Sequence, residues 1–298
     1  MTLRVTKFDG EYPALAAWTG EPVAELRAMI EEYHSEERDT WLAWDGDGVV
    51  GALHPWRRPD GRHTLYFGPT RPDAYAPLAA TVPGEVYVTV PDDEVGLFEG
   101  FVVERREYRY LVPVSVFDAP VPAGIALVSA AEVGIELMAL DCALREDVPG
   151  ADGWRPDPVW FREETWDSPF FDPEAYLVAV ATPKTVAGPG AVAAPGAGTR
   201  AGAGTGLDAG VERDLVGLVR VWNGPRPVPR LGMVGVLPGY RKRGLAKALV
   251  GAAFRALHAR GVPEVACEVD AANTGSNALF RGLGGRVVGV DVELRRPV

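Results

Sequence analysis

The chain has 298 residues, of which 47% are apolar and 9% aromatic, enough to fill the cores of about two ordinary domains. Its formal net charge of −11 leaves no basic field that could hold a polyanion, so neither nucleic acid nor an anionic membrane is expected as a partner. Two cysteines and four scattered histidines predict no disulfide framework and no metal site. The sequence shows no apolar leader and no run of eighteen apolar residues, so a cytoplasmic protein is expected.

The first half of the sequence predicts a mixture of strands and helices. Strands are expected at residues 3–8, 41–53 with a turn at 45–48, 63–67, 85–90 and 101–114. A helix is expected over 22–33, where proline stands at a favourable first helical position, and a short helix over 92–100. A proline-marked connector at 117–124 then predicts a boundary between a domain of residues 1–117 and one of residues 118–298.

The second half predicts a helix followed by antiparallel strands and a β-α-β-α-β end. Strands are expected at residues 125–130, 175–182, 214–222, 230–236, 264–270 and 286–296, and helices at 131–146, after Gly244 and at 276–284. Residues 182–212 are almost wholly Ala, Gly, Pro and Thr, which is typical of a flexible surface loop. We expect an α+β protein of two domains, each a mixed, mainly antiparallel sheet flanked by helices.

The stretch VLPGYRKRGLAKAL at residues 236–249 predicts an anion site between a strand and a helix. Pro238 and Gly239 end the strand, and Gly244 opens a segment with helical spacing of apolar residues. A helix N-terminus binds phosphate through its unpaired N–H groups when the preceding loop lets the backbone come close. The predicted pyrophosphate site therefore comprises three cations, a glycine and two small or buried residues: Arg241, Lys242, Arg243, Gly244, Leu245 and Ala246. A solvated basic face is the alternative explanation for the cations.

Two motifs in this half resemble those of the GNAT superfamily of acyltransferases. The run RKRGLA at residues 241–246 matches the family's acyl-CoA pyrophosphate motif, [QR]-x-x-G-x-[GA], and follows a predicted strand and V-x-P. The stretch EVDAANTGSNALFRGLGG at 268–285 resembles the second family signature, in order and at family spacing. The resemblance covers residues 119–298. Residues 85–103 resemble the same closing unit without the pyrophosphate motif, so the first half resembles a degenerate copy, as in tandem GNAT proteins of the mycothiol-synthase kind.

The resemblance implies that an acyl-CoA, most simply acetyl-CoA, binds in an opening between the strands at 230–236 and 264–270. Its pantetheine arm would pair with the backbone of Val234 and Val236, its pyrophosphate would take the amides of residues 243–246, and Asn273 and Phe280 would lie beside the arm. An acceptor amine would attack the thioester directly. Asn273 is equally well explained as a helix N-cap. Phe280 stands where many members of the family carry a tyrosine that protonates the departing thiolate.

The sequence leaves alternatives open for the general base and for the acceptor pocket. Glu268 and Asp270 share one face of a predicted strand, so either could point into the cleft as general base, although salt-bridged carboxylates are commoner. Trp154, Trp160 and Trp166 are candidates for the wall of an acceptor pocket, with packing the commoner role. The leading interpretation is a metal-free, acetyl-CoA-dependent N-acetyltransferase, monomeric or homodimeric. A non-catalytic acyl-CoA-binding module and a mycothiol-synthase-like acetyltransferase are the alternatives.

Overall fold

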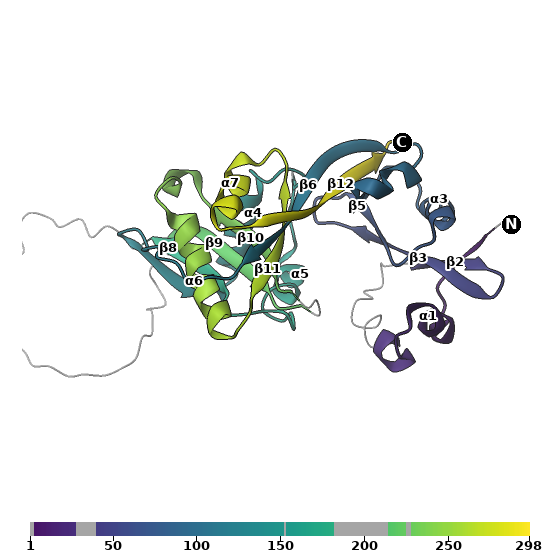
Figure 1. Ribbon diagram of the computed structural model, residues 1–298, viewed down its shortest axis with the longest axis horizontal. Helices are drawn as coiled ribbons and strands as arrows, with labels where there is room; N and C mark the ends of the chain where they lie inside the picture. The colour runs from purple at the N-terminus through teal and green to yellow at the C-terminus, as the bar shows by residue number, and fades with distance from the viewer. Residues whose placement is uncertain (1–2, 28–39, 152, 182–213, 225–227) are drawn as a thin grey trace, which may run out of the picture. The chain divides into compact units, whose positions relative to one another are not determined.

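The computed structural model describes residues 3–27, 40–151, 153–181, 214–224 and 228–298 (Figure 1). The loop predicted at 182–212 lies outside the described residues, as does the second half of the helix predicted at 22–33, of which residues 23–27 are helical. No helix within the described ranges is long and apolar enough to cross a membrane.

The chain groups into two compact units, each made of segments that are separate in the sequence. Unit 1 comprises Met1–Pro113, Arg145–Glu164 and Glu264–Val298, and unit 2 comprises Val114–Leu144 and Thr165–Pro263. Two units agree in number with the two expected domains. Unit 1, however, includes residues 264–298, which the sequence interpretation assigns to the second domain; the boundary at 117–118 stays a prediction.

Unit 1 is built on a sheet whose strand order is β1-β2-β3-β4-β5-β12-β6-β11. Its strands, most of them expected from alternating or apolar runs, are β1 (Arg4–Lys7), β2 (Trp41–Asp45), β3 (Gly48–Arg57), β4 (His63–Phe67), β5 (Val86–Pro91), β6 (Val102–Pro113), β11 (Glu264–Asp270) and β12 (Arg286–Arg296). Neighbours pair antiparallel except β4 and β5, which are parallel through two residue pairs only.

The last strand of the chain lies inside this sheet. β12 pairs with β5 on one side and with β6 on the other, and Figure 1 shows it in yellow alongside these two strands from the first half of the chain. Val292 and Leu294 are buried in a core that also contains Val86 and Val88, and Glu293 between them is buried on the other face of the strand. The first-half strands therefore complete their core with residues from the C-terminus.

The helices of unit 1 are short apart from the first and last. They are α1 (Tyr12–Thr19), α3 (Tyr75–Ala79), α5 (Pro158–Glu163) and α7 (Thr274–Gly282), with 3-10 turns η1 (Pro72–Ala74) and η2 (Asp92–Leu97). α7 and η2 were expected, whereas α1, α3 and α5 were not. The start of α5 follows from Asp157, whose side chain accepts hydrogen bonds from the amides of Val159 and Trp160, and from Pro158 at the first helical position.

Unit 2 contains an antiparallel sheet of order β7-β8-β9-β10, with α6 packed against it. Its elements are β7 (Ile125–Ser129), η3 (Ala130–Glu132), α4 (Glu136–Arg145), β8 (Tyr176–Ala181), β9 (Asp214–Trp222), β10 (Arg230–Val236), η4 (Pro238–Tyr240) and α6 (Leu245–Ala259). The helix expected from residue 131 begins at Glu136 instead. Ser129 and Glu132 form a capping box that closes a separate 3-10 turn, and Val133 is extended, so the chain must start a new helix.

Candidate functional site

The predicted pyrophosphate site forms a tight loop in unit 2 between β10 and α6. β10 ends at Val236, η4 turns the chain, and the loop then passes through two left-handed residues, Lys242 at φ 59° and Gly244 at φ 82°. Lys242 is the one non-glycine residue with positive φ among those described. Because a side chain in this conformation costs about 1–2 kcal/mol, the loop holds its shape against a local preference.

The start of α6 leaves room for an anion. Gly244 is the N-cap and provides no side-chain hydrogen bond to the first turn, and a Cβ placed on it would meet no atom within 4 Å. Leu245 is buried and anchors the helix, which runs for 15 residues. The first N–H groups of a helix have no intrahelical partner, and the helix dipole adds partial positive charge there. The residues present therefore fit the pyrophosphate of an acyl-CoA.

Three exposed cations flank this helix start, and two of them are oriented by their neighbours. The Nε of Arg241 donates to the carbonyl oxygen of Val236 at 2.8 Å, which ties the loop to the end of β10. The guanidinium of Arg243 lies 5.5 Å from the ring centre of Tyr240. Lys242 between them is exposed. The loop thus places Arg241 to Ala246 at the start of α6, and their contact with a pyrophosphate stays a prediction.

The strand before the loop is irregular. The β9–β10 register shifts between Leu231 and Met233, with Gly232 packed under the ring of Trp222. Val234 and Val236, the predicted pantetheine contacts, lie beyond this bulge and pair with Val219 and Gly217 of β9.

The other predicted site residues, Glu268, Asp270, Asn273 and Phe280, lie in unit 1. Asp270 ends β11 and is buried; one oxygen accepts from the amide of Ala272 at 2.7 Å, and the other lies 3.7 Å from the Nη1 of Arg105. These two partners favour a structural role for its carboxylate. Glu268 lies two residues earlier and is half-buried.

Asn273 is the N-cap of α7, as its alternative explanation predicts, since its Oδ1 accepts from the amide of Ser276 at 3.0 Å. Sequence reasoning missed Asn277. This buried amide donates to the carbonyl oxygens of Asp270 (2.9 Å) and Asn273 (2.8 Å) and accepts from the hydroxyl of Tyr110 (2.8 Å). Asn277 therefore fixes the turn between β11 and α7.

Phe280 is a core residue of unit 1. It is 2% exposed, and its ring centre lies 6.1 Å from that of Tyr110. Burial and ring contact explain an apolar side chain here on packing grounds. Contact with an acyl-CoA stays a prediction for Phe280.

The sheet of unit 1 carries a row of three carboxylates, here called the carboxylate row: Asp270 of β11, Glu107 of β6 and Asp291 of β12. Glu107 is the register partner of Asp270 on one side and of Asp291 on the other. Directly opposed residues in antiparallel strands project from the same face, so the three acids share one face. Glu268, two residues before Asp270 on β11, lies on that face as well, because side chains alternate between the two faces of a strand.

Asp291 is the carboxylate of this row that is least compensated. Burial raises its pKa above the ordinary value, and the nearby charges of Glu107 and Glu268 raise it further, against the lowering effect of Arg109. The Nε of Arg109 lies 3.4 Å from its Oδ1. No sequence pattern singles out Asp291, because only the strand register brings it beside Glu107.

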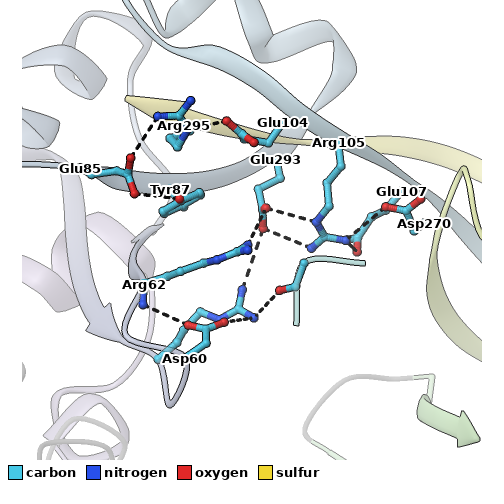
Figure 2. Close-up of polar contacts among 12 residues, drawn as sticks. Asp60, Arg62, Glu85, Tyr87, Glu104, Arg105, Glu107, Asp270, Glu293 and Arg295 are labelled. Carbon is cyan, nitrogen blue, oxygen red and sulfur yellow. Dashed lines mark hydrogen bonds and ion pairs between the residues drawn. The ribbon is translucent and has the colours of Figure 1, made fainter. Parts of the chain in front are cut away.

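Arginines interleave with the acids next to this row. Figure 2 shows Glu293 facing Arg62 and Arg105. Arg105 binds Glu293 at 3.2 Å, Arg62 binds it at 3.3 Å, and Arg105 also pairs with Glu107. The Nη1 of Arg58 lies 3.9 Å from Glu293, whose side chain is 4% exposed. Within the described part of the chain, no group of three His, Cys, Asp or Glu side chains could hold a metal ion.

Comparison with known proteins bears on both units. The model of a protein family described as "Acetyltransferase (GNAT) family" matches residues 154–284, which include the pyrophosphate loop and α7. This stretch of the chain is similar to a GNAT acetyltransferase domain. A search of curated proteins found no match.

Solved structures share the GNAT fold over nearly the whole chain. A GCN5-related N-acetyltransferase from Sphaerobacter thermophilus is 19% identical, with a TM-score of 0.64 over 98% of this chain and 95% of its own. A tandem GNAT protein from the clavulanic acid biosynthesis pathway is 15% identical, with a TM-score of 0.59 over 99% of this chain and 98% of its own. At these identities the likeness establishes the mixed α/β fold, with helices flanking a large sheet, and not the substrate.

Proposed function

We propose that this protein is an N-acyltransferase that moves an acetyl group from acetyl-CoA to the amine of a small molecule or peptide by direct attack in a ternary complex. The observation that carries the proposal is the open, cation-flanked start of α6 at Gly244, within a segment that matches the GNAT family. An acyl-CoA supplies an activated thioester when bound. The residues of the chain then have to hold it, orient the amine and remove a proton.

Donor binding is assigned to the pyrophosphate loop and β10. The amides of residues 243–246 and the charges of Arg241, Lys242 and Arg243 would hold the pyrophosphate. The backbone of Val234 and Val236 would pair with the pantetheine arm. Asn273 and Phe280 are retained as proposed contacts, with their hydrogen-bonding and packing roles described above.

We assign the general base to the acids of unit 1, with Asp291 as the first candidate and Glu268 as the second. A base works best when its pKa is raised towards the working pH, and the pKa of Asp291 is raised by burial and by two neighbouring carboxylates. Asp270 is the weaker candidate, because its oxygens are engaged by Arg105 and the Ala272 amide.

The acceptor is proposed to be an amine of low pKa. A lysine-like amine with a pKa of about 10.4 lies ~3.4 units from neutral at pH 7, or ~4.6 kcal/mol, whereas an α-amine near 7.8 requires only ~1 kcal/mol. A carboxylate base takes a proton more easily from the second. An acidic sheet face also attracts the cationic form of the amine.

We propose one acyl-CoA site per chain. In unit 1 the end of β4 carries an aromatic cluster, in which the ring of Phe67 lies 4.9 Å from that of Tyr75 and 5.8 Å from that of Phe98. The nearby cation, Arg71, already binds Asp45 and Asp73. Neither feature favours a second pyrophosphate site.

A non-catalytic acyl-CoA-binding module is the second candidate. It is favoured by Phe280, a buried ring without the hydroxyl that would protonate a leaving thiolate. A thiol of pKa about 8.5 is already a good leaving group, so we rank this candidate below catalysis.

The test of donor binding compares two glycines at opposite ends of α6. Gly244→Asp places a carboxylate against the pyrophosphate and should abolish acetyl-CoA binding in calorimetry. Gly261→Asp is the matched control, because Gly261 also has positive φ (75°) and open space at its Cβ, but follows the helix C-terminus. The control should lose similar stability and bind normally.

Turnover is tested by thiol release from acetyl-CoA with a panel of amines. We expect release with α-amines and similarly acidic amines, at rates that exceed those with lysine ε-amines and that rise with pH. Equal binding by both glycine variants would contradict the assigned donor site. Normal binding without thiol release from any amine would favour the binding module instead.

A further inference from the structure

A second site is indicated by a cavity of about 690 Å³ in unit 1. It is lined by the end of β3, the start of β4, residues 81–83 and residues 155–160, and contains no residue of the pyrophosphate loop or of the carboxylate row. Its volume lies within the ~300–1,000 Å³ that small-molecule sites occupy. The donor site proposed above does not use this cavity, although Trp160, a candidate for the wall of an acceptor pocket, lines it.

Aromatic rings form one wall of the cavity. Trp41, Trp56 and Trp160 line it and are half-buried, so part of each indole is accessible. Trp56 and Trp160 stack at 25° with ring centres 6.5 Å apart, and Tyr66 supports Trp56 from 6.0 Å. Four prolines also line the cavity and stiffen its backbone: Pro55, Pro59, Pro83 and Pro156. Rigid, half-exposed indoles favour a ligand with a flat apolar ring.

The lining also contains cationic side chains, against the negative charge of the whole chain. Arg57 lines the cavity and is exposed, and no carboxylate among the described residues pairs with it. Arg155 also lines it; its Nη1 donates to the carbonyl oxygen of Trp154 at 2.7 Å, and its Nη2 lies 3.8 Å from the carboxylate of Glu146. The acid in the lining, Asp157, is engaged as the N-cap of α5. Arg57 is therefore the cation of this lining that remains available to an anion.

Arg57 and His63 mark where the anionic group would lie. Both belong also to an adjoining cavity of about 380 Å³, so they stand at the common wall of the two spaces. Burial lowers the pKa of His63, and the positive charge of Arg57 lowers it further. An anion at this wall would offset that charge.

We propose that this cavity binds a small planar aromatic anion, with its carboxylate or phosphate at Arg57 and its ring against Trp56 and Trp160. Guanidinium groups recognise both kinds of oxyanion. The ligand chemistry is thus an aryl carboxylate or an aromatic phosphate monoester, and its binding is separate from donor binding at Gly244.

The test is calorimetry on the full chain with probes that differ in one property at a time. We expect 2-naphthoate or adenosine 5′-monophosphate to bind, and which of them binds more tightly identifies the carboxylate or the phosphate as the preferred anion. 2-Naphthylmethylamine, which keeps the ring and reverses the charge, should bind at least tenfold more weakly. Cyclohexanecarboxylate, which keeps the charge and loses the flat ring, should also bind at least tenfold more weakly than 2-naphthoate.

Variants then locate the bound probe. Arg57→Gln and Trp160→Leu should each weaken binding of the better probe at least tenfold, and Arg57 is exposed, so its replacement does not endanger folding. Arg255→Gln removes an exposed arginine from α6 and should leave binding unchanged. Failure of both aromatic anions to bind at millimolar concentration, or equal effects of Arg57→Gln and Arg255→Gln, would overturn the proposal.

Discussion

Asp291 is a residue whose charge opposes folding. Its side chain is 15% exposed, and burial together with Glu107 and Glu268 raises its pKa. A carboxyl group whose pKa is raised in the folded protein contributes stability only while it is protonated, below the unfolded pKa of about 3.9. At neutral pH the ionised form therefore destabilises the sheet that holds it. A functional role is one reason to retain such a group.

The neutral isostere Asp291→Asn is expected to raise the melting temperature at pH 7 by about 1–3 °C, because the like-charge repulsion and the desolvated charge are removed. The advantage should shrink as the pH falls and vanish below about pH 4, where the carboxyl group is protonated in both states. If Asp291 is the base, the same variant loses acyl transfer while keeping acetyl-CoA binding. Thermal scans from pH 3 to 8 and amine turnover measure the two effects.

Asp270→Ala is the contrasting change in the same row. It leaves the Ala272 amide without its acceptor and removes one carboxylate from Arg105, so we expect a melting temperature several degrees lower at pH 7. A stabilised Asp270→Ala, or an Asp291→Asn variant that is less stable but fully active, would show that the roles of the two acids are reversed.

At the scale of the element, α7 is held by one side chain inside the helix. Asn277 bonds two carbonyls of its own turn and the hydroxyl of Tyr110 on β6, whereas Asn273 contributes a cap bond to Ser276. The cap lies at the exposed end and the internal amide is buried. The two asparagines should therefore differ in their effect on stability.

Asn277→Ala should cost about 2–4 kcal/mol, because it leaves buried polar groups unsatisfied, and Asn273→Ala about 1 kcal/mol, the usual loss for a cap. Urea unfolding followed by circular dichroism gives both free energies. Tyr110→Phe, which deletes only the hydroxyl, should lose part of the stability that Asn277→Ala loses. The double variant should be little less stable than Asn277→Ala alone, because the two side chains share one hydrogen bond. Equal losses at the two positions would contradict this ranking.

Local patterns predict the elements that local chemistry determines. Alternating and apolar runs predict the strands, and for β10, β11 and β12 the predicted bounds equal the observed ones. The alternative explanation of Asn273 as a helix N-cap is also confirmed. The helix predicted from residue 131 begins only at Glu136, because the Ser129–Glu132 capping box closes a separate 3-10 turn. The sequence interpretation does not include α5, although Asp157 followed by Pro158 is an N-terminal helix signal. Asn277 and Asp291 could not be found this way, because their partners are set by strand pairing between residues far apart.

At the scale of the whole molecule, the C-terminal strand belongs to the sheet of the first half. Leu294 and Val292 fill the core between β5 and β6, and Glu293 on the other face neutralises Arg62 and Arg105. A sequence pattern identifies β12 as a strand but does not identify its neighbours. Its partner strands, β5 and β6, lie about 180 residues or more away in the chain. That distance is why the connector at 117–124 marks a plausible boundary in sequence while the contacts run across it.

Removal of residues 286–298 is expected to unfold unit 1. The truncation removes two core side chains worth about 1.5–3 kcal/mol each and the ladders on both sides of β12. It also leaves the arginines around Glu293 without their buried partner, a loss of about 3–5 kcal/mol. Together these approach the ~5–15 kcal/mol stability of an ordinary domain.

For the same reason a fragment of residues 1–117 should not fold alone, and should gain cooperative unfolding when residues 264–298 are joined to it by a linker. Deletion of the exposed residues 297–298 alone, as the control, should change nothing. Cooperative thermal unfolding of the isolated 1–117 fragment would instead show that the first half is a domain in its own right and that β12 only adds to it.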